Sequence, residues 1–349
     1  MRNDPLRLPP PQCDNVDVAT TSPTPRLNIL WASDGSDSAL AASPLIDSLV
    51  ASVAATLHVL TVAPAPMFSG ARLDPVYLKP WPAKERRAAL ERAMSVARRS
   101  VQRLESTNAA IEPKARFGHP IQEILRHADQ QSVDLIALGA KGHSNLRLML
   151  LGSVTQGVLE YAKRPVLIVR PGSASVTTAV VGIDGSGESL RALQFLQGLS
   201  PEPGALLALT RVVQMISQRR TRWSHQTDAY GAEARRLNDE AMKRAEEDLT
   251  AAHDLLNRSV STEANEIAVG RSGEQLLKAA AQRKADLNVV GSRRPSRARK
   301  YLLGSTAEMI AREASARYWL SARTIPIRWI RHASTSTLEA APRCRPSER

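Results

Sequence analysis

The stretch Gly139-Ala-Lys-Gly142-His-Ser-Asn-Leu-Arg-Leu-Met-Leu-Leu-Gly152-Ser153 carries the strongest signal in this sequence. It follows an apolar run over residues 133–138, which predicts a buried strand, and it leads into a helical pattern over residues 154–162. Glycines let a backbone approach an anion closely, and the free amides at a helix N-terminus favour negative charge. The stretch therefore predicts a loop that holds phosphate. It is not a Walker A loop, because no lysine precedes Ser153.

A second copy of the same pattern lies further along the chain. Asp34-Gly-Ser after an apolar run returns as Asp184-Gly-Ser, an offset of 150 residues. The loop returns as Gly291-Ser-Arg-Arg followed by Gly304-Ser, an offset of 152 residues from Gly139. Two motifs that recur at nearly one offset indicate an internal duplication. A chain of 349 residues is long enough for two domains, each with its own core.

Each copy has the same predicted order of elements. In the first copy we expect strands over residues 27–32, 57–62, 111–117, 133–138 and 166–169. Helical patterns separate them, over residues 38–55, 83–106, 121–130 and 154–162. The second copy repeats this order to about residue 330, with its long helix between residues 232 and 257. Strands that alternate with helices form a parallel sheet covered on both faces, so the expected class is α/β.

The ends of the chain differ from the two copies. Residues 1–26 hold six prolines, and residues 331–349 are mostly Ser, Thr, Ala, Pro and Arg, so we expect two disordered tails. The expected domains are therefore residues 27–172 and 173–330. No apolar run is long enough to span a bilayer, which predicts a soluble, cytoplasmic protein with no membrane partner.

Both cysteines, Cys13 and Cys344, lie in the predicted tails. This position argues against a disulfide framework or a metal site, and it suits a reducing compartment. We therefore expect no structural metal.

The formal net charge of +13 is spread along the chain. The densest basic cluster lies in the second copy's loop and comprises Arg293, Arg294, Arg297, Arg299 and Lys300. Such a cluster suits phosphate or nucleic acid, or it is simply a solvated loop. Only 4% of the residues are aromatic, which leaves few platforms for base stacking. A nucleic-acid partner is therefore not expected.

Residues 27–172 resemble the universal stress protein family over their whole length. The matching pieces, in order, are Asp34-Gly-Ser, His58-Val59, Gly118-His-Pro120, Val133-Asp-Leu-Ile, the loop ending in Gly152-Ser153-Val154, and Arg164-Pro-Val-Leu-Ile-Val169. The resemblance implies a doubly wound, five-stranded parallel sheet that is Rossmann-like and adenine nucleotide alpha-hydrolase-like, present twice in tandem. ATP-binding members of the family hold the nucleotide at the carboxyl ends of the strands, where open parallel sheets generally place ligands.

The resemblance also implies a set of binding residues. By position, Asp34 lies near the adenosine, the backbone of Val59 meets the adenine edge, and Gly139 and Gly142 let the loop pass close to the ribose and phosphates. Gly152, Ser153 and Val154 present amides and the serine hydroxyl to the phosphates. The implied ligand is ATP, with or without a magnesium ion.

Each of these residues also has a purely structural interpretation. Asp34 suits a turn or a helix cap, Val59 suits a buried strand, the glycines suit turns, and Ser153 suits an N-cap. Lys141 suits a phosphate contact or an ordinary surface position. His58 is expected to be a core or half-buried residue.

The second copy departs from the pattern at its loop. Arg294 stands where the first copy has Gly142, Pro295 follows it, and Thr306 stands where the first copy has Val154. The nucleotide is therefore expected mainly in the first copy, with an anion site built from Arg293, Arg294 and Arg297 as an open alternative for the second.

No triad, metal cluster or paired carboxylate is visible, so the leading interpretation is a regulatory ATP-binding stress-response module without dedicated catalytic activity. A slow ATPase or nucleotidyl-transfer enzyme of the same fold and a ligand-free interaction scaffold are the alternatives. Family members often pair through the final strand. We therefore expect residues 166–169 and 317–322 to associate face to face within the chain, with both loops on one surface. A homodimer through the same strands is the alternative.

Overall fold

The computed structural model describes most of the two predicted domains. The described residues are 26–52, 55–65, 81–105, 109–141, 151–170, 176–199, 205–216, 227–256, 261–262, 265–291, 304–313 and 318–322. Both predicted tails, apart from Arg26, lie outside this set, as do Gly142, Arg293, Arg294 and Arg297.

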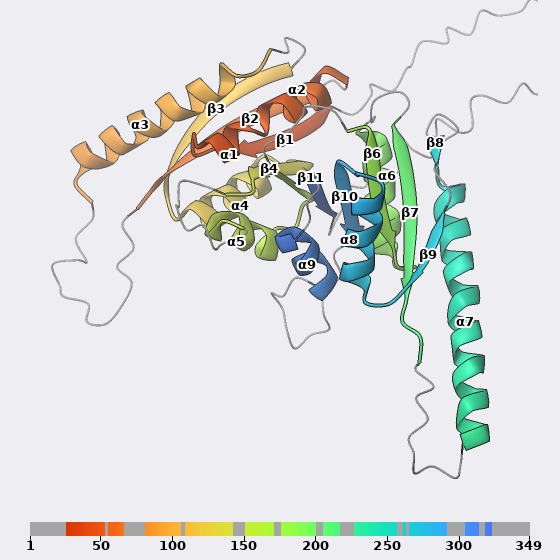
Figure 1. Cartoon of the computed structure of the whole chain (residues 1–349). Helices are drawn as coiled ribbons and strands as arrows, with labels where there is room; N and C mark the ends of the chain where they lie inside the picture. Colours follow the sequence, from red (N-terminus) through yellow and green to blue (C-terminus); the bar gives the residue numbers. More distant parts are fainter. Residues whose placement is uncertain are drawn as a thin grey trace, which may run out of the picture.

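The first half of the chain forms a parallel sheet of five strands (Figure 1). Their order across the sheet is β3 (Ala109–Gly118), β2 (Ala55–Pro64), β1 (Leu27–Ala32), β4 (Leu135–Gly139) and β5 (Val166–Val169). The chain first builds outward from β1 through β2 to β3 and then returns to add β4 on the other side of β1. This reversal opens a crevice at the carboxyl ends of β1 and β4.

Helices cover both faces of this sheet. One face carries α1 (Asp37–Leu40), α2 (Ser43–Ser52) and α3 (Ala83–Val101), and the other carries α4 (Pro120–Gln130) and α5 (Ser153–Tyr161). The single helix predicted over residues 38–55 is two helices. Pro44 has no N–H to donate to the carbonyl of Leu40, which accepts the Ser43 hydroxyl instead, at 2.8 Å.

The second half repeats the arrangement. Its strands run in the order β11 (Tyr318–Ala322), β10 (Leu287–Gly291), β6 (Thr178–Ile183) and β7 (Leu206–Val213), and both β8 (Ser261–Thr262) and β9 (Glu266–Val269) pair with β7. Helices α6 (Gly187–Gly198) and α7 (Thr227–Asp254) cover one face, and α8 (Ser272–Gln282) and α9 (Ser305–Glu313) the other. The predicted α/β class with two tandem parallel sheets is confirmed.

The two sheets join into one sheet of 11 strands through β5 and β11, which pair antiparallel. Leu167 lies opposite Leu320, and the neighbouring strands repeat this symmetry, since Ala137 pairs with Leu167 and Val289 with Leu320. An approximate two-fold axis therefore passes between Leu167 and Leu320. The predicted strands do associate, but the expected face-to-face contact is wrong, because their open edges hydrogen-bond directly.

The antiparallel join also corrects the expected position of the loops. The strands of each half are parallel among themselves, so the carboxyl ends of β4 and β10 point in opposite directions. The two loops therefore begin at opposite edges of the sheet and not on a common surface. The edge of β5 beside β11 is occupied by the same chain, so the expected pairing within the chain is the one observed.

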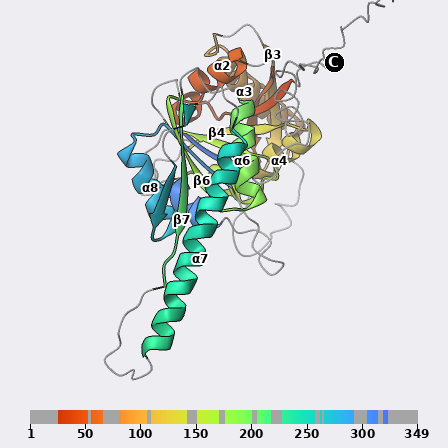
Figure 2. The same cartoon turned by 90° about the vertical axis from the view of Figure 1, so that its right-hand side faces the viewer.

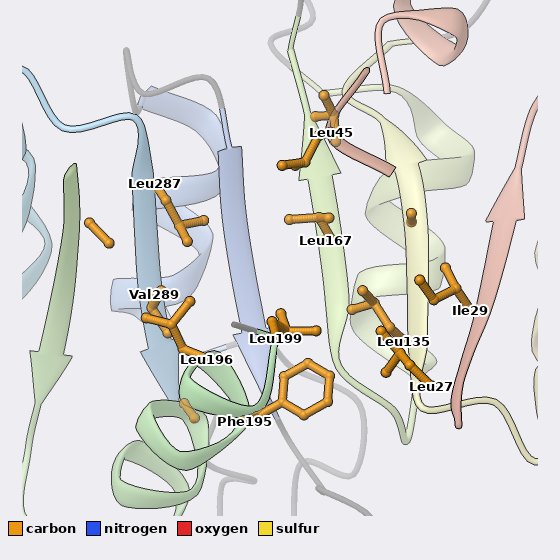
Figure 3. Packing of buried hydrophobic residues seen from close by; sticks show 14 of the residues in the cluster. Leu27, Ile29, Leu45, Leu135, Leu167, Phe195, Leu196, Leu199, Leu287 and Val289 are labelled. Carbon is orange, nitrogen blue, oxygen red and sulfur yellow. The ribbon is translucent and has the colours of Figure 1, made fainter. Parts of the chain in front are cut away.

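The halves share their apolar core. Leu27, Ile29, Leu135 and Leu167 of the first half belong to one buried cluster with Phe195, Leu199, Leu287 and Val289 of the second (Figure 3). On the other face, the guanidinium of Arg170 at the end of β5 donates to the carbonyl of Ala311 near the end of α9, at 2.6 Å. None of the described helices combines the length and apolar character needed to cross a bilayer.

Candidate functional site

A pocket of ≈ 380 Å³ opens at the carboxyl ends of β1, β2 and β4 in the first half. This is the crevice that the strand order predicts, and its volume falls within the range of small-molecule sites. Its walls are Ala32, Ser33, Asp34, Ala39, Leu60, Thr61, Val62, Pro64, Pro120, Ile124, Leu138, Gly139, Lys141, Gly152, Ser153, Val154 and Thr155.

Asp34 lies in a tight turn at the end of β1. One carboxylate oxygen accepts the amide of Ser36 at 3.0 Å and the Ser36 hydroxyl at 2.6 Å. Gly35 between them has φ +79°, a conformation that favours glycine. Asp34 is exposed and lines the pocket, so the turn holds its carboxylate at the pocket mouth.

Gly139 ends β4 where helix α1 crosses it. A Cβ at Gly139 would lie 2.7 Å from the amide nitrogen of Ala39 and nearer still to the carbonyl of Ser38. The amide of Lys141 donates to the Ser38 hydroxyl at 2.9 Å. Gly139 is therefore required first by the approach of α1. The Lys141 side chain is exposed at the pocket wall and supplies a cation there.

Helix α5 points its N-terminus at the pocket. Gly152 is the N-cap, with an extended backbone (φ −68°, ψ 149°), and it has no side chain to accept the first amides of the helix. The amide of Gly152 donates to the carbonyl of Ala140 at 2.8 Å, and the Thr155 hydroxyl donates to the carbonyl of Gly139 at 2.8 Å. These two bonds fix the helix start against the end of β4, with Ser153 and Val154 at the pocket wall.

The opposite wall is apolar. It comes from Leu60, Val62 and Pro64 on β2 and from Pro120 and Ile124 on α4. Val59 does not line the pocket: its side chain is fully buried in the core beneath α2 and α3. Strand β2 continues to Pro64 because it pairs with β3 over ten residues, which carries its carboxyl end beyond Val59.

A buried hydroxyl cluster supports the junction of β1 and β2. Ser33 and Ser100 are linked through their hydroxyl oxygens at 2.9 Å, and the Thr61 hydroxyl donates to the carbonyl of Ser33 at 2.9 Å. Ser33 and Thr61 both line the pocket. The cluster thus ties α3 to the two strands that form the pocket floor.

Two buried histidines lie directly behind the apolar wall. His58 on β2 and His127 on α4 meet edge to face, with ring centroids 5.4 Å apart. Burial lowers the pKa of His58, an effect partly opposed by Glu112, whose carboxylate lies 3.5 Å from Nδ1. Burial, followed by the nearby Arg116, lowers the pKa of His127 to about 4. Both rings are therefore neutral near pH 7.

Nδ1 of His127 accepts a hydrogen bond from the Nε–H of Arg116 at 3.2 Å. This bond requires an unprotonated Nδ1 and therefore a neutral ring. The guanidinium of Arg116 also lies 3.6 Å from the Glu123 carboxylate. The two neutral histidines thus hold α4 against β2 and β3. His127 lies one turn of α4 from Ile124, which lines the pocket.

The structure brings most of the predicted site residues together. Asp34, Gly139, Gly152, Ser153 and Val154 all line the pocket, whereas Val59 does not and Gly142 lies outside the described residues. Sequence reasoning missed Ser33, Thr61, Pro120 and Thr155. Pro120 and Thr155 adjoin matched motifs, but Thr61 carries no sequence signal, because its place depends on how far β2 extends.

The described residues also limit the chemistry of the site. Among them, no group of three or more His, Cys, Asp or Glu side chains gathers to hold a metal. A magnesium ion that entered with a nucleotide would be held by the phosphates and water, with Asp34 as the carboxylate of the pocket. The arrangement suits binding: amides and a lysine for anions, and apolar side chains for a flat ring.

The second half lacks several of these features. By strand register, Arg211 stands in the place of Thr61, and its Nε donates to the carboxylate of Asp248 on α7 at 2.9 Å. Ala307 stands in the place of Thr155, so this position of α9 offers no hydroxyl to the end of β10. Asp184 keeps the turn, since its carboxylate accepts the amide of Ser186 at 3.0 Å.

Comparison with known proteins gives a consistent result. A model of the universal stress protein family matches residues 26–170 and again residues 176–319. The chain is 37% identical over 67 residues, 19% of its length, to a universal stress protein of Methanocaldococcus jannaschii, and 49% identical over 53 residues, 15% of its length, to one of Bacillus subtilis. These segments span only 41% and 36% of the two curated relatives.

The fold also matches a solved structure. A universal stress protein from Archaeoglobus fulgidus superimposes with a TM-score of 0.60 over 85% of this chain and 98% of that chain, at 21% sequence identity. At this identity the likeness shows a shared fold.

Proposed function

This chain belongs to the universal stress protein family, and we propose that it is a regulatory module whose first half binds one adenine nucleotide, ATP, at the carboxyl edge of its sheet. The observation that carries the proposal is the pocket itself. It places an uncapped helix N-terminus and Lys141 on one side and an apolar wall on the other. A nucleotide likewise has an anionic phosphate end and a flat, largely apolar base.

Each end of the nucleotide has a matching wall. The amides of Ser153 and Val154 and the Ser153 hydroxyl would meet the phosphates, with Lys141 as a point charge beside them. The adenine would lie against Leu60, Val62 and Ile124, with main-chain groups of Thr61 and Val62 in the role that Val59 was expected to take. Asp34 would accept from the ribose hydroxyls.

The same site favours binding over turnover. Lys141 and Asp34 are the described ionisable residues at the pocket, a cation and a carboxylate that suit the charge and the hydroxyls of a bound nucleotide. A slow ATPase remains the alternative, and a turnover that disappears in Ser153→Ala would favour it. A stress-response role and a cytoplasmic location stay predictions from the sequence.

The experiment compares proline at the two helix starts. Ser153→Pro removes the first amide of α5, and the extended backbone of Gly152 suits the residue before a proline. We expect ATP affinity, measured by isothermal titration, to fall at least tenfold in Ser153→Pro and less in Ser153→Ala. Ser305→Pro, the matched change at the start of α9, should leave affinity unchanged.

Equal affinity in wild type and Ser153→Pro, with normal circular dichroism, would show that the phosphates lie elsewhere. A wild-type protein whose melting temperature does not rise with ATP would favour the ligand-free scaffold.

A further inference from the structure

Helices α3 and α7 occupy equivalent places in the two halves but carry opposite charge. Helix α3 has six Arg or Lys and two Glu residues, a net charge of +4. Helix α7 has eight acidic and four basic residues, a net charge of −4 with His253 neutral. In α3 the excess charge lies mainly in the C-terminal half, whereas the two halves of α7 carry the same net charge of −2.

The basic surface lies at the end of α3 and just beyond it. Arg92, Arg98, Arg99 and Arg103 are exposed, and the segment from Arg92 to Leu104 contains no acidic residue. None of the four makes an ion pair within the described part of the chain. We call these four side chains the α3 arginine face.

The acidic surface lies at the end of α7. Glu246, Glu247 and Asp254 are exposed, and the segment from Ala245 to Leu256 contains no Lys or Arg. Across the described ranges none of the three has an ion-pair partner, whereas the neighbouring Asp248 is bound by Arg211. We call the three side chains the α7 acidic face.

The two faces differ in how they suit their own helix. Arginines near a helix C-terminus interact favourably with the helix dipole, but carboxylates there do not. Asp254 of the α7 acidic face is thus unfavourably placed, since it ends α7 and only His253 is a basic group in the last turn. A cationic partner would remove this unfavourable interaction.

Within the described part of the chain, the α3 arginine face lies too far away to be that partner. Helix α3 packs on β2 and β3, and α7 packs on β7, at opposite flanks of the sheet (Figures 1 and 2). Strands β2 and β7 are seven strand spacings apart, which is about 34 Å at the usual separation of about 4.8 Å. Both helices cover the same face of the sheet, so both charged faces are open to another molecule on that side.

We propose that two copies of this chain associate through these helices, with the α3 arginine face of one copy against the α7 acidic face of the other. Every copy carries both faces, so a two-fold dimer forms the contact twice. Opposite charges at facing positions fix the partner and the orientation. This interface goes beyond the nucleotide site and does not depend on it.

Salt sets the conditions under which the dimer is seen. The net charge of +13 repels two copies, but at about 0.1 M salt the Debye length of about 10 Å screens distant charges more than close pairs. We therefore expect a dimer at about 0.1 M salt in sedimentation velocity at micromolar concentrations, and a monomer at about 1 M.

Charge reversal tests the contact. Arg98→Glu/Arg99→Glu places like charges opposite the α7 acidic face, and Glu246→Arg/Glu247→Arg does the same opposite the α3 arginine face. Each variant alone should sediment as a monomer, with its affinity for itself at least tenfold weaker. An equimolar mixture of the two should form a dimer again, because each partner then meets a complementary face.

Lys278→Glu/Lys284→Glu is the matched control. It changes the net charge as much as the α3 variant does, but on the segment around α8, which covers the opposite face of the sheet, and it should leave the dimer intact. Circular dichroism of all variants checks the fold. A monomeric wild type at about 0.1 M salt, or a mixture that stays monomeric, would overturn the proposal. A monomer whose α3 arginines bind duplex DNA would replace it with a nucleic-acid surface.

Discussion

The carboxyl edges of the two half-sheets share one sequence pattern but carry different side chains at key positions. Both keep the Asp-Gly-Ser turn and a glycine where the first helix crosses the fourth strand, since a Cβ at Gly291 would lie 2.6 Å from the amide nitrogen of Ser189. The first edge adds hydroxyls, at Thr61 and Thr155, that organise a pocket. The second has Arg211 and Ala307 there. Shared features therefore maintain the fold, and under the proposed function the differences determine which edge binds the nucleotide.

The strongest test of the shared part is Gly139→Ala. The new methyl would collide with the backbone of α1, which cannot move without leaving the sheet, and we expect the free energy of unfolding to fall by about 3 kcal/mol. Gly304→Ala is the control, because a Cβ at Gly304 meets nothing within 4 Å. Urea unfolding measures both. Equal stability of the two variants would mean that α1 does not need the glycine.

The histidine pair belongs to the first half alone, since Ala208 and Ala279 take the places of His58 and His127 in the second. The pKa of His127 is lower when folded (about 4) than when unfolded (about 6.5), so the unfolded chain binds the extra proton first. Stability should therefore be complete above about pH 6.5 and fall as the pH approaches 4, by about 2 kcal/mol between pH 7 and pH 5.

His127→Gln removes this titration and keeps an acceptor for Arg116. Its unfolding free energy should depend less steeply on pH than that of the wild type over the same window. Parallel pH profiles for the two proteins would show that His127 is not the group responsible.

The ion pair between Arg211 and Asp248 at the second edge can be replaced by the residues that the first edge has at these positions. Arg211→Thr leaves Asp248, whose side chain is 25% exposed, without its guanidinium partner, and we expect a loss of about 2 kcal/mol. The double variant Arg211→Thr/Asp248→Val introduces the residues that the first half has at the equivalent positions, Thr61 and Val96. It should recover most of the lost stability. A double-mutant cycle measures the coupling, and additive losses would contradict the pairing.

Much of this molecule follows from local sequence pattern. The repeat and the alternation of strands and helices predict the tandem α/β fold, and the glycine-rich stretch predicts where β4 meets α5. Other features depend on contacts between distant segments. How far β2 extends past Val59 is set by its pairing with β3, and Gly139 is needed by α1, which lies 100 residues earlier in the chain.

The join between the halves was predicted in part. The apolar strand Val166–Val169 indicated an edge that needs covering, and it pairs with β11. Whether such strands stack or hydrogen-bond edge to edge cannot be read from their composition, because apolar residues are compatible with either arrangement. The position of the two loops follows from that choice.

The central claim is that the first edge binds ATP and the second does not bind it in the same way. Isothermal titration of the wild-type chain with ATP measures this directly through the stoichiometry. The account predicts about one ATP per chain, because among the described residues it is the first edge that combines a tethered helix start with Lys141 and an apolar wall. A stoichiometry near two would show that the second edge is also a nucleotide site, and no binding at all would contradict the account.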